Sequence, residues 1–195
     1  QGKPILMHTI NKFKDTLPGI QIVVVLPSNH IALWESLCKL HSFHILHEMV
    51  TGGETRFHSV KNGLQHVPDD CVVAIHDAVR PLVSKTTILT AFETAEQKGN
   101  ACPAIPLNES IRKVENGRNK AVDRNKYLIV QTPQCFQATA IKKAFLQAYS
   151  PAFTDDATVL ESIGETIHLV EGNRENSKIT TPWDLSIAEV FMSAK

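Results

Sequence analysis

The 195 residues of this chain are 43% hydrophobic and 21% charged, which is typical of a soluble globular protein large enough for one α/β domain. Its 20 Lys and Arg residues balance its 20 Asp and Glu residues, so neither nucleic acid nor an anionic membrane is predicted as a partner. The longest apolar runs, such as residues 22–26, have the length of a strand and are too short to cross a membrane.

Helix-like and strand-like segments alternate along the chain. Apolar residues at helical spacing mark the helices, and continuous apolar runs mark buried strands. In chain order the pattern predicts helix 4–13, strand 20–27, helix 31–40, strand 43–50, a helix around Val60 and Leu64, strand 72–75, helix 84–98, strand 101–106, a hairpin at Asn116-Gly117, strand 128–133, helices 138–149 and 155–162, strand 166–172 and a final helix. This alternation predicts an α/β fold, with a mostly parallel sheet and helices on both faces.

Two local signals add detail to this organisation. Thr181, followed by Pro182 and Asp184, has the spacing of a capping box and predicts the start of the final helix. Asn116-Gly117 between two short runs is a strong hairpin signal, and it interrupts the alternation. We therefore expect a single domain over residues 1–195, with a β-arm at about 107–127.

The stretch HDAVRP, from His76 to Pro81, places charged residues at the end of a buried strand. A carboxylate there is unfavourable unless it is paired or bound. Asp77 and Arg80 can simply neutralise each other, since surface ion pairs are common and weak. The alternative is that Asp77 orients a substrate or a metal-bound phosphate while Arg80 holds phosphate or carboxylate oxygens. Ligands collect at the carboxyl ends of parallel strands, where these residues are expected.

Three further stretches combine loop residues with the start of a helix. In TGGETRFHSV, the glycines allow close approach to a ligand, and Glu54 and Ser59 are candidates to read a sugar or base edge; an ordinary loop is the alternative. In NRENSKITTP, Lys178 precedes a helix and suits a phosphate, although most lone lysines are solvated. FTDDATVLE is typical of a helix cap, with Thr154 or Asp155 as the capping residue.

The other reactive residue types form no recognisable site. The four cysteines are spread out without a CxxC pair, which argues against zinc or a disulfide framework and predicts a reducing, cytoplasmic location. The nine histidines lack the spacing of metal ligands, so no metal site made by the protein is predicted. A nucleophile elbow and a Walker phosphate loop are absent from the sequence.

The order of these motifs resembles one enzyme family. GGETRFHSV, HDAVRPLV, VDRN, VQTPQCF, FTDDATVLE and LVEGNRENSKITTPWDL together resemble the 2-C-methyl-D-erythritol 4-phosphate cytidylyltransferases of the non-mevalonate isoprenoid pathway. The resemblance runs from Gln1 to about Glu189. It implies a Rossmann-like nucleotidyltransferase fold whose arm interlocks two subunits of a homodimer. It also implies that a substrate phosphate oxygen attacks the α-phosphorus of CTP and pyrophosphate leaves, with Mg²⁺ bridging the triphosphate.

The resemblance carries roles over to individual residues. The nucleotide-binding positions are Gly53, Glu54 and Ser59. The substrate-binding positions are Asp77, Arg80, Ser110, Arg124, Thr154 and Lys178. Catalytic roles fall on Asp77, Arg80 and Lys178, and Arg124 matches an arginine delivered to the neighbouring subunit. The family more often has Asp at the Glu54 position and Thr at the Ser110 position.

One part of the family pattern has no counterpart in this sequence. Members carry a glycine-rich loop after the first strand, with an arginine and a lysine that grip the triphosphate, whereas GKPILMHTI resembles the segment just after that loop. We expect residues upstream of Gln1 to supply it. Two alternatives stay open: a ribitol 5-phosphate cytidylyltransferase, and a non-catalytic module that binds a nucleotide or a sugar phosphate.

Overall fold

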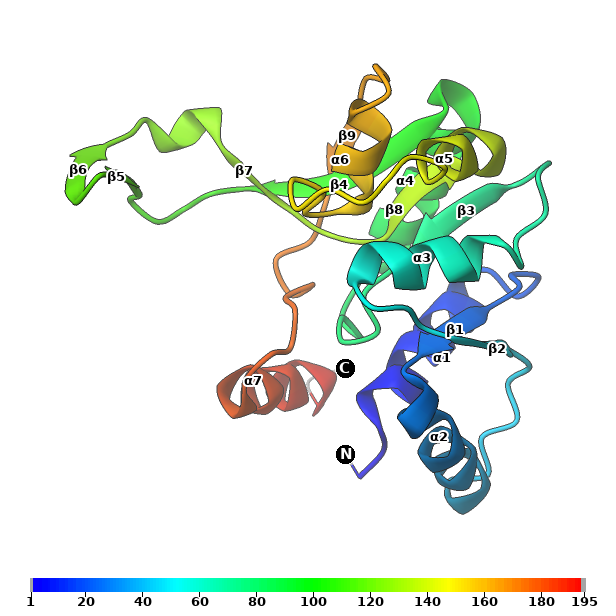
Figure 1. Cartoon of the computed structure of the whole chain (residues 1–195). Helices are drawn as coiled ribbons and strands as arrows, with labels where there is room; N and C mark the ends of the chain where they lie inside the picture. Colours follow the sequence, from blue (N-terminus) through cyan, green and yellow to red (C-terminus); the bar gives the residue numbers. More distant parts are fainter. Residues whose placement is uncertain (1, 194–195) are drawn as a thin grey trace.

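The computed structural model describes residues 2–193, so residues 1, 194 and 195 of the expected domain lie outside the described part. Helices and strands alternate along the chain (Figure 1). In chain order they are α1 (Ile5–Thr16), β1 (Val23–Leu26), α2 (Ser28–Leu40), β2 (Glu48–Thr51), α3 (Arg56–Leu64), β3 (Val72–Ile75), α4 (Lys85–Lys98), β4 (Asn100–Pro106), β5 (Arg112–Glu115), β6 (Arg118–Ala121), the 3-10 helix η1 (Arg124–Lys126), β7 (Leu128–Val130), β8 (Gln134–Gln137), α5 (Ala138–Ala144), α6 (Asp156–Glu161), β9 (Leu169–Glu171) and α7 (Pro182–Ser193).

Within residues 2–193 the strands form three sheets. β1 and β2 pair in parallel, and β5 and β6 form an antiparallel hairpin. In the five-stranded sheet, β8 lies between β3 and β4 and is antiparallel to both. β7 is also antiparallel to β4, and β9 is parallel to it. β3, β4 and β9 therefore run in the same direction, whereas β7 and β8 run against them. The sheet is thus mixed, with antiparallel strands that the sequence did not predict.

The arm explains the antiparallel pairs. β4 leads into the arm and β7 brings the chain back beside the same strand, so the two run in opposite directions and Ala104 pairs with Val130. β8 continues this return towards the start of β4, where Asn100 lies opposite Phe136. The apolar pattern predicted a strand over residues 128–133 and missed β8, because a proline separates it from β7.

Alternate residues of β3 and β8 face different helices. Val72 and Ala74 of β3 and Cys135 of β8 pack in the cluster formed with α4. Val73 of β3 and Phe136 of β8 pack on the opposite face, against α3, α5 and α6. This alternation, with a period of two residues, puts helices on both faces of the sheet, so the predicted α/β class is confirmed.

The β1–β2 sheet is also covered on two sides. Met7 of α1, Val24 of β1 and Trp34 of α2 form the buried centre of one side. On the other side, a Cβ atom on Gly63 of α3 would come within 2.9 Å of Val25 Cγ2. Gly63 therefore allows α3 to approach β1 closely, although glycine weakens a helix interior.

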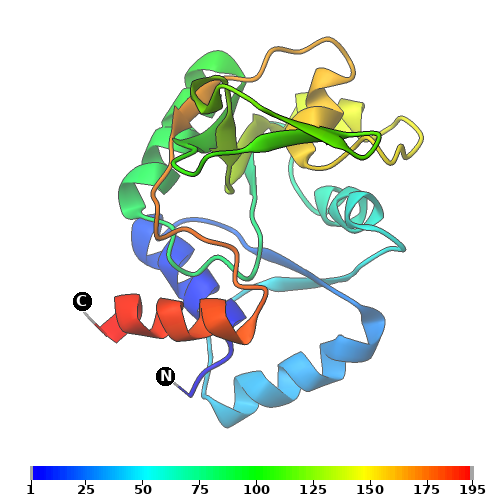
Figure 2. The same cartoon turned by 90° about the vertical axis from the view of Figure 1, so that its left-hand side faces the viewer.

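The predicted hairpin projects away from the body of the molecule (Figure 1). Asn116 and Gly117 turn the chain with φ values of 50° and 73°, the left-handed conformation that a two-residue hairpin turn requires. Near the N-terminus, Ile5 of α1 packs against the cluster that contains Ala188 of α7, so the two terminal helices lie side by side (Figure 2).

The ends of the helices follow local hydrogen bonding. Gly99 closes α4 in the left-handed conformation, as predicted. The predicted capping box of α7 is formed, because Thr181 N–H donates to Asp184 Oδ2 (2.8 Å) and the Asp184 N–H donates to Thr181 Oγ1 (3.3 Å). α5 ends at Ala144, earlier than predicted, where Gln147 Nε2 donates to the Ala144 carbonyl (2.8 Å).

Candidate active site

The segment after β3 closes on itself through hydrogen bonds. The Arg80 N–H donates to the Asp77 carbonyl (3.1 Å), and His76 Nε2 lies 3.1 Å from the Arg80 carbonyl. Arg80 Nε also donates to Asp77 Oδ2 (3.0 Å). Only 15% of the Asp77 side chain and 13% of the Arg80 side chain are exposed, so this pair is more strongly desolvated than an ordinary surface ion pair.

Lys178 reaches the same carboxylate from the loop between β9 and α7. Its Nζ lies 3.4 Å from Asp77 Oδ2, so the structure brings together the three residues to which catalytic roles were assigned. Although burial opposes ionisation, the hydrogen bond from Arg80 and the charge of Lys178 lower the pKa of Asp77. The Lys178 side chain is 46% exposed, which leaves its cation accessible to a ligand.

Thr132 also belongs to this group, although its place at the end of a predicted strand gave it no role of its own. Its hydroxyl oxygen accepts the Asp77 N–H (3.1 Å) and lies 3.0 Å from His76 Nδ1. The hydroxyl can donate to that nitrogen, which leaves His76 Nε2 protonated and able to donate to the Arg80 carbonyl. Burial lowers the pKa of His76 to about 4, which favours this neutral form. We call these five residues (His76, Asp77, Arg80, Thr132 and Lys178) the Asp77 cluster.

The glycine pair folds over the N-terminus of α3. The Gly53 N–H donates to Ser59 Oγ (3.0 Å), and the Ser59 hydroxyl donates to the Thr55 carbonyl (3.0 Å). A Cβ atom on Gly53 would come within 2.4 Å of His58 Cβ, so the loop can pack this closely only with glycine. Glu54 is exposed beside Gly53. The three predicted nucleotide-binding residues therefore lie together at a helix N-terminus, a position that favours anionic ligands.

A second ion pair lies near Asp77. Arg56 Nη1 donates to Asp156 Oδ1 (2.8 Å), and Arg56 Nη2 donates to Asp156 Oδ2 (2.5 Å). The Asp156 side chain is fully buried in the first turn of α6, whereas 39% of the Arg56 side chain is exposed. Although burial opposes the charged form, Asp156 raises the pKa of Arg56, and the charge of Asp77 adds to this effect. The pair connects the first turns of α3 and α6 and holds the partly exposed Arg56 guanidinium near Asp77.

Three predicted substrate-binding residues have no bond to the Asp77 cluster among the described residues. Thr154 is exposed before α6, and Asp155 rather than Thr154 caps that helix. Ser110 and Arg124 are exposed in the arm, where the Arg124 guanidinium donates to the Asn108 carbonyl. Among the described residues, no hydrogen bond joins any of the three to the side chains of the Asp77 cluster.

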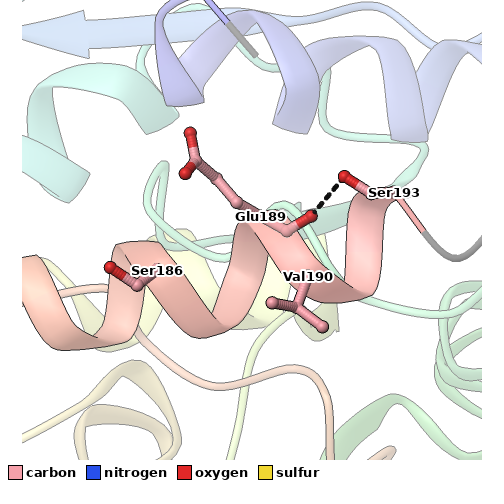
Figure 3. A pocket seen from close by; sticks show the side chains of 4 residues that line it. All are labelled: Ser186, Glu189, Val190 and Ser193. Atoms are coloured by element: carbon pink, nitrogen blue, oxygen red, sulfur yellow. Dashed lines mark hydrogen bonds between the residues drawn. The ribbon is translucent and has the colours of Figure 1, made fainter.

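A hollow beside α7 is a different feature. Its lining consists of Ser186, Glu189, Val190 and Ser193 (Figure 3). These residues come from successive turns of one helix, and Ser193 Oγ donates to the Glu189 carbonyl (2.8 Å). No member of the Asp77 cluster lines the hollow, so its position does not coincide with the converging charges.

Residues 2–193 form neither a metal centre nor a membrane span. Over that range, no group of three or more His, Cys, Asp or Glu side chains is placed to hold a metal ion. No helix in the same range is long and apolar enough to span a membrane. The four cysteines are free, and burial raises the pKa of Cys102 to about 12, which makes its thiol a poor nucleophile.

The family model for 2-C-methyl-D-erythritol 4-phosphate cytidylyltransferase matches residues 1–194. The chain belongs to this family. The protein of that name from Porphyromonas gingivalis is 47% identical over 194 residues, which are 99% of this chain and 86% of the relative. The one from Phocaeicola vulgatus is 46% identical over 191 residues, which are 98% of this chain and 87% of the relative.

Solved structures of the family support the fold. The crystal structure of the Thermus thermophilus protein of the same name has a TM-score of 0.82 and 28% identity, and the match covers 98% of this chain and 90% of that one. The Francisella tularensis structure has a TM-score of 0.82 and 32% identity, with coverage of 97% and 88%. The predicted nucleotidyltransferase fold and enzyme class are therefore confirmed, and the non-catalytic alternative is set aside. Enzymes of this family generally use a divalent metal.

Proposed function

We propose that this chain transfers the cytidylyl group of CTP to 2-C-methyl-D-erythritol 4-phosphate at the Asp77 cluster. The observation that carries this assignment is the convergence of two cations on one carboxylate. Asp77 Oδ2 lies 3.0 Å from Arg80 Nε and 3.4 Å from Lys178 Nζ. Cations held this close together provide a local positive field for a phosphate in a chain whose formal net charge is +0.

The proposed chemistry is an in-line displacement. An oxygen of the substrate phosphate forms a bond to the α-phosphorus of CTP, and the bond from that phosphorus to the β-phosphate oxygen breaks. Pyrophosphate leaves with the electron pair of the broken bond. Because no covalent enzyme intermediate is needed, the protein contributes position and charge neutralisation. We assign Arg80 and Lys178 to the substrate phosphate, and Asp77 to the substrate hydroxyls and to holding both cations.

The remaining substrate contacts are assigned to Ser110, Arg124 and Thr154. Thr154 stands directly before the first turn of α6, which Arg56 joins to the neighbourhood of Asp77. Ser110 and Arg124 lie on the arm and are proposed to serve the site of a second subunit. The Arg124 guanidinium has five N–H donors, so it can bind a phosphate while keeping its hydrogen bond to Asn108.

The loop before α3 is the proposed site for the cytidine part of CTP. Gly53 and Ser59 are fixed by their mutual hydrogen bond, and Glu54 is exposed next to them. The missing Cβ of Gly53 lets this loop pack against His58 of α3. The helix N-terminus beside the loop favours nearby negative charge.

Magnesium is the divalent ion that we propose for the reaction. Mg²⁺ commonly uses one or two carboxylates together with waters and substrate phosphates. Asp77 is one such carboxylate, but it already pairs with Arg80 and Lys178, so these residues fit an ion held chiefly by the triphosphate. Bound there, the ion would neutralise charge on the phosphates.

We propose that residues 1–195 form one domain and that the arm, residues 107–127, joins two copies of it. The strand β7 at the base of the arm exposes 48% of Leu128, 43% of Ile129 and 41% of Val130. Successive side chains of a strand point to opposite faces, so both faces of β7 lack a full cover. A second copy packed there would cover this apolar surface. The four free cysteines support a reducing, cytoplasmic setting.

The substrate is tested by a side-by-side assay of the full-length protein with CTP and Mg²⁺. Pyrophosphate release is followed with 2-C-methyl-D-erythritol 4-phosphate or ribitol 5-phosphate, and with the unphosphorylated alcohol as control. The names of the relatives favour methylerythritol, so its kcat/KM should exceed that of ribitol phosphate by at least about tenfold. Equal or reversed values would contradict the substrate assignment.

A further inference from the structure

Asn176 is a buried amide between exposed neighbours in the loop that joins β9 to α7. Its exposed fraction is 0%, whereas Glu175, Ser177 and Lys178 beside it are exposed. A buried amide is unfavourable unless its polar atoms are paired. The partners of Asn176 therefore indicate what the residue does.

Asn176 connects this loop to two segments of the Asp77 cluster. Its Nδ2 donates to the Thr132 carbonyl (2.8 Å). Its backbone carbonyl accepts from Arg80 Nη1 (2.7 Å) and from Gln131 Nε2 (3.3 Å). One residue thus joins the turn after β3, the segment before β8 and the loop that carries Lys178.

The position of Lys178 depends on such anchors. Its side chain is 46% exposed, and a partly exposed ion pair to Asp77 at 3.4 Å is too weak to hold a loop by itself. Asn176 fixes the chain just before Lys178. Just after it, the Ile179 N–H donates to the Val79 carbonyl (3.0 Å), and the Ile179 side chain is buried.

The Asn176 amide leaves one acceptor unpaired. Oδ1 is buried and has no hydrogen-bond partner among the described residues. Turning the amide over would place this oxygen against the Thr132 carbonyl, so the orientation is determined by the Nδ2 bond. An apolar side chain of similar size would avoid the unpaired oxygen but would lose the donor to Thr132. The Asn176 amide therefore holds its loop against Thr132 although its unpaired oxygen lowers the stability of the fold.

We propose that Asn176 is a positioning residue for cytidylyl transfer. By holding the Lys178 loop to Arg80 and Thr132, it keeps the two cations close enough to contact one substrate phosphate. Because it is fully buried, it acts through these residues and touches no ligand. This inference rests on the proposed assignment of Arg80 and Lys178 to the substrate phosphate. It goes further by making activity depend on a hydrogen bond outside the ligand's reach.

Asn176→Leu in the full-length protein tests this role against a matched control, Asn100→Leu. Asn100 is 3% exposed, its Nδ2 donates to the Thr166 carbonyl (2.9 Å), and its Oδ1 accepts the His168 N–H (2.9 Å). Asn100 lies opposite Phe136, near the C-terminal end of β8, whereas Thr132 precedes the N-terminal end of that strand. The two variants therefore remove a buried amide near the Asp77 cluster and a buried amide far from it.

The two variants should show opposite patterns. Asn176→Leu should lower kcat/KM for the methylerythritol phosphate by about tenfold or more, with a raised KM for that phosphate and little change in the KM for CTP. Asn100→Leu should keep these constants and lower Tm more, because both polar ends of its amide are paired. Asn176→Ala removes the same donor without adding a branched side chain, and it should show the same kinetic loss as Asn176→Leu.

Lys178→Ala supplies the second comparison. If Asn176 acts largely through Lys178, Asn176→Leu should lower kcat/KM by a much smaller factor in the Lys178→Ala background than in the wild type. The change in Tm should be the same in both backgrounds. Wild-type kinetics in both Asn176 variants, or independent effects of Asn176 and Lys178, would overturn the inference. Wild-type kinetics in Lys178→Ala would instead overturn the site assignment on which it rests.

Discussion

The Asp77 cluster and the arm hold their charged residues in different ways. In the cluster, the Asp77 and Arg80 side chains are 15% and 13% exposed. In the arm, every residue of β5 and β6 is exposed, and the Lys113–Glu115 ion pair (2.9 Å) joins side chains that are 52% and 65% exposed. The cluster has buried partners from other parts of the chain, whereas β5 and β6 of the arm pair with each other in a hairpin.

This difference indicates which contacts fix the conformation of each region. The cluster is held by hydrogen bonds between segments far apart in the chain, so one subunit is enough to shape it. A two-stranded hairpin without further packing is only marginally stable in water. The geometry of Arg124 should therefore depend on what the arm packs against, which in our proposal is a second subunit.

The largest expected effect comes from removing Arg124, the arm cation that we assign to the substrate. Arg124→Ala should lower kcat/KM roughly 10- to 100-fold, because a charge-assisted phosphate contact is lost. The thermal midpoint should hardly change, since Arg124 is exposed. Lys126→Ala is the matched control, because Lys126 is another exposed cation of the same 3-10 helix, and it should keep activity. Equal kinetics in the two variants would remove Arg124 from the site.

Mixing variants tests whether the arm crosses between subunits. Arg124→Ala subunits and Asp77→Ala subunits should each have at most about a tenth of the wild-type activity alone. After unfolding and joint refolding in equal amounts, half of the dimers are mixed, and each mixed dimer contains one site with both residues intact. Activity should therefore recover to about a quarter of the wild-type value per site. If activity stays at the level of the separate variants, Arg124 does not act on a partner.

The next effect compares ion pairs in the two regions. Asp156→Asn should lower the free energy of unfolding by about 2 kcal/mol, since Asp156 is fully buried although its partner Arg56 is 39% exposed. Lys113→Ala breaks the exposed pair of the arm and should cost less than about 0.5 kcal/mol. Urea unfolding of both variants measures these values. Similar losses would mean that the arm is as well packed as the body.

Local chemistry accounts for the parts of this molecule that the sequence predicted well. Asp77 and Arg80 are three residues apart at a strand end, so a short turn is enough to bring them together. The capping box of Thr181 and the turn at Asn116 likewise depend on neighbours within four residues. Lys178 is different, because its place before a helix suited a phosphate but only the family resemblance placed it with Asp77.

Contacts between distant segments account for most of what was missed. Arg56 and Asp156 are separated by 100 positions, and the sequence around each residue does not predict which residue it pairs with. Thr132 was expected at a strand end, but its bond to the Asp77 N–H requires the antiparallel return of the chain after the arm. Asn176 looked like an ordinary loop residue, because its burial appears only when Arg80 and Thr132 are in place.

The smallest expected effect is a pH dependence of folding stability, which arises from His76 in the body of the molecule and has no counterpart in the arm. Burial lowers the pKa of His76 to about 4 from 6.5, whereas residues 107–127 contain no histidine. The unfolded chain therefore binds more protons than the folded chain between these values, so stability is complete above about pH 6.5 and falls as the pH drops towards 4. The loss between pH 7 and pH 5 should be on the order of 1–2 kcal/mol. Asp77 adds little in this window, because its lowered pKa contributes stability that is lost only below its ordinary value of 3.8.

The variant His76→Gln isolates the contribution of His76 to the pH dependence of stability. Glutamine keeps a donor for the Arg80 carbonyl and an acceptor for the Thr132 hydroxyl but cannot be protonated. The variant should be less sensitive than the wild type to a change from pH 7 to pH 5 in urea unfolding, whatever its stability at pH 7. Other ionisable groups affect both proteins alike and cancel in the difference. An identical pH slope in both proteins would mean that His76 is open to protonation in the folded chain, and that the cluster is less well shielded from water than its contacts indicate.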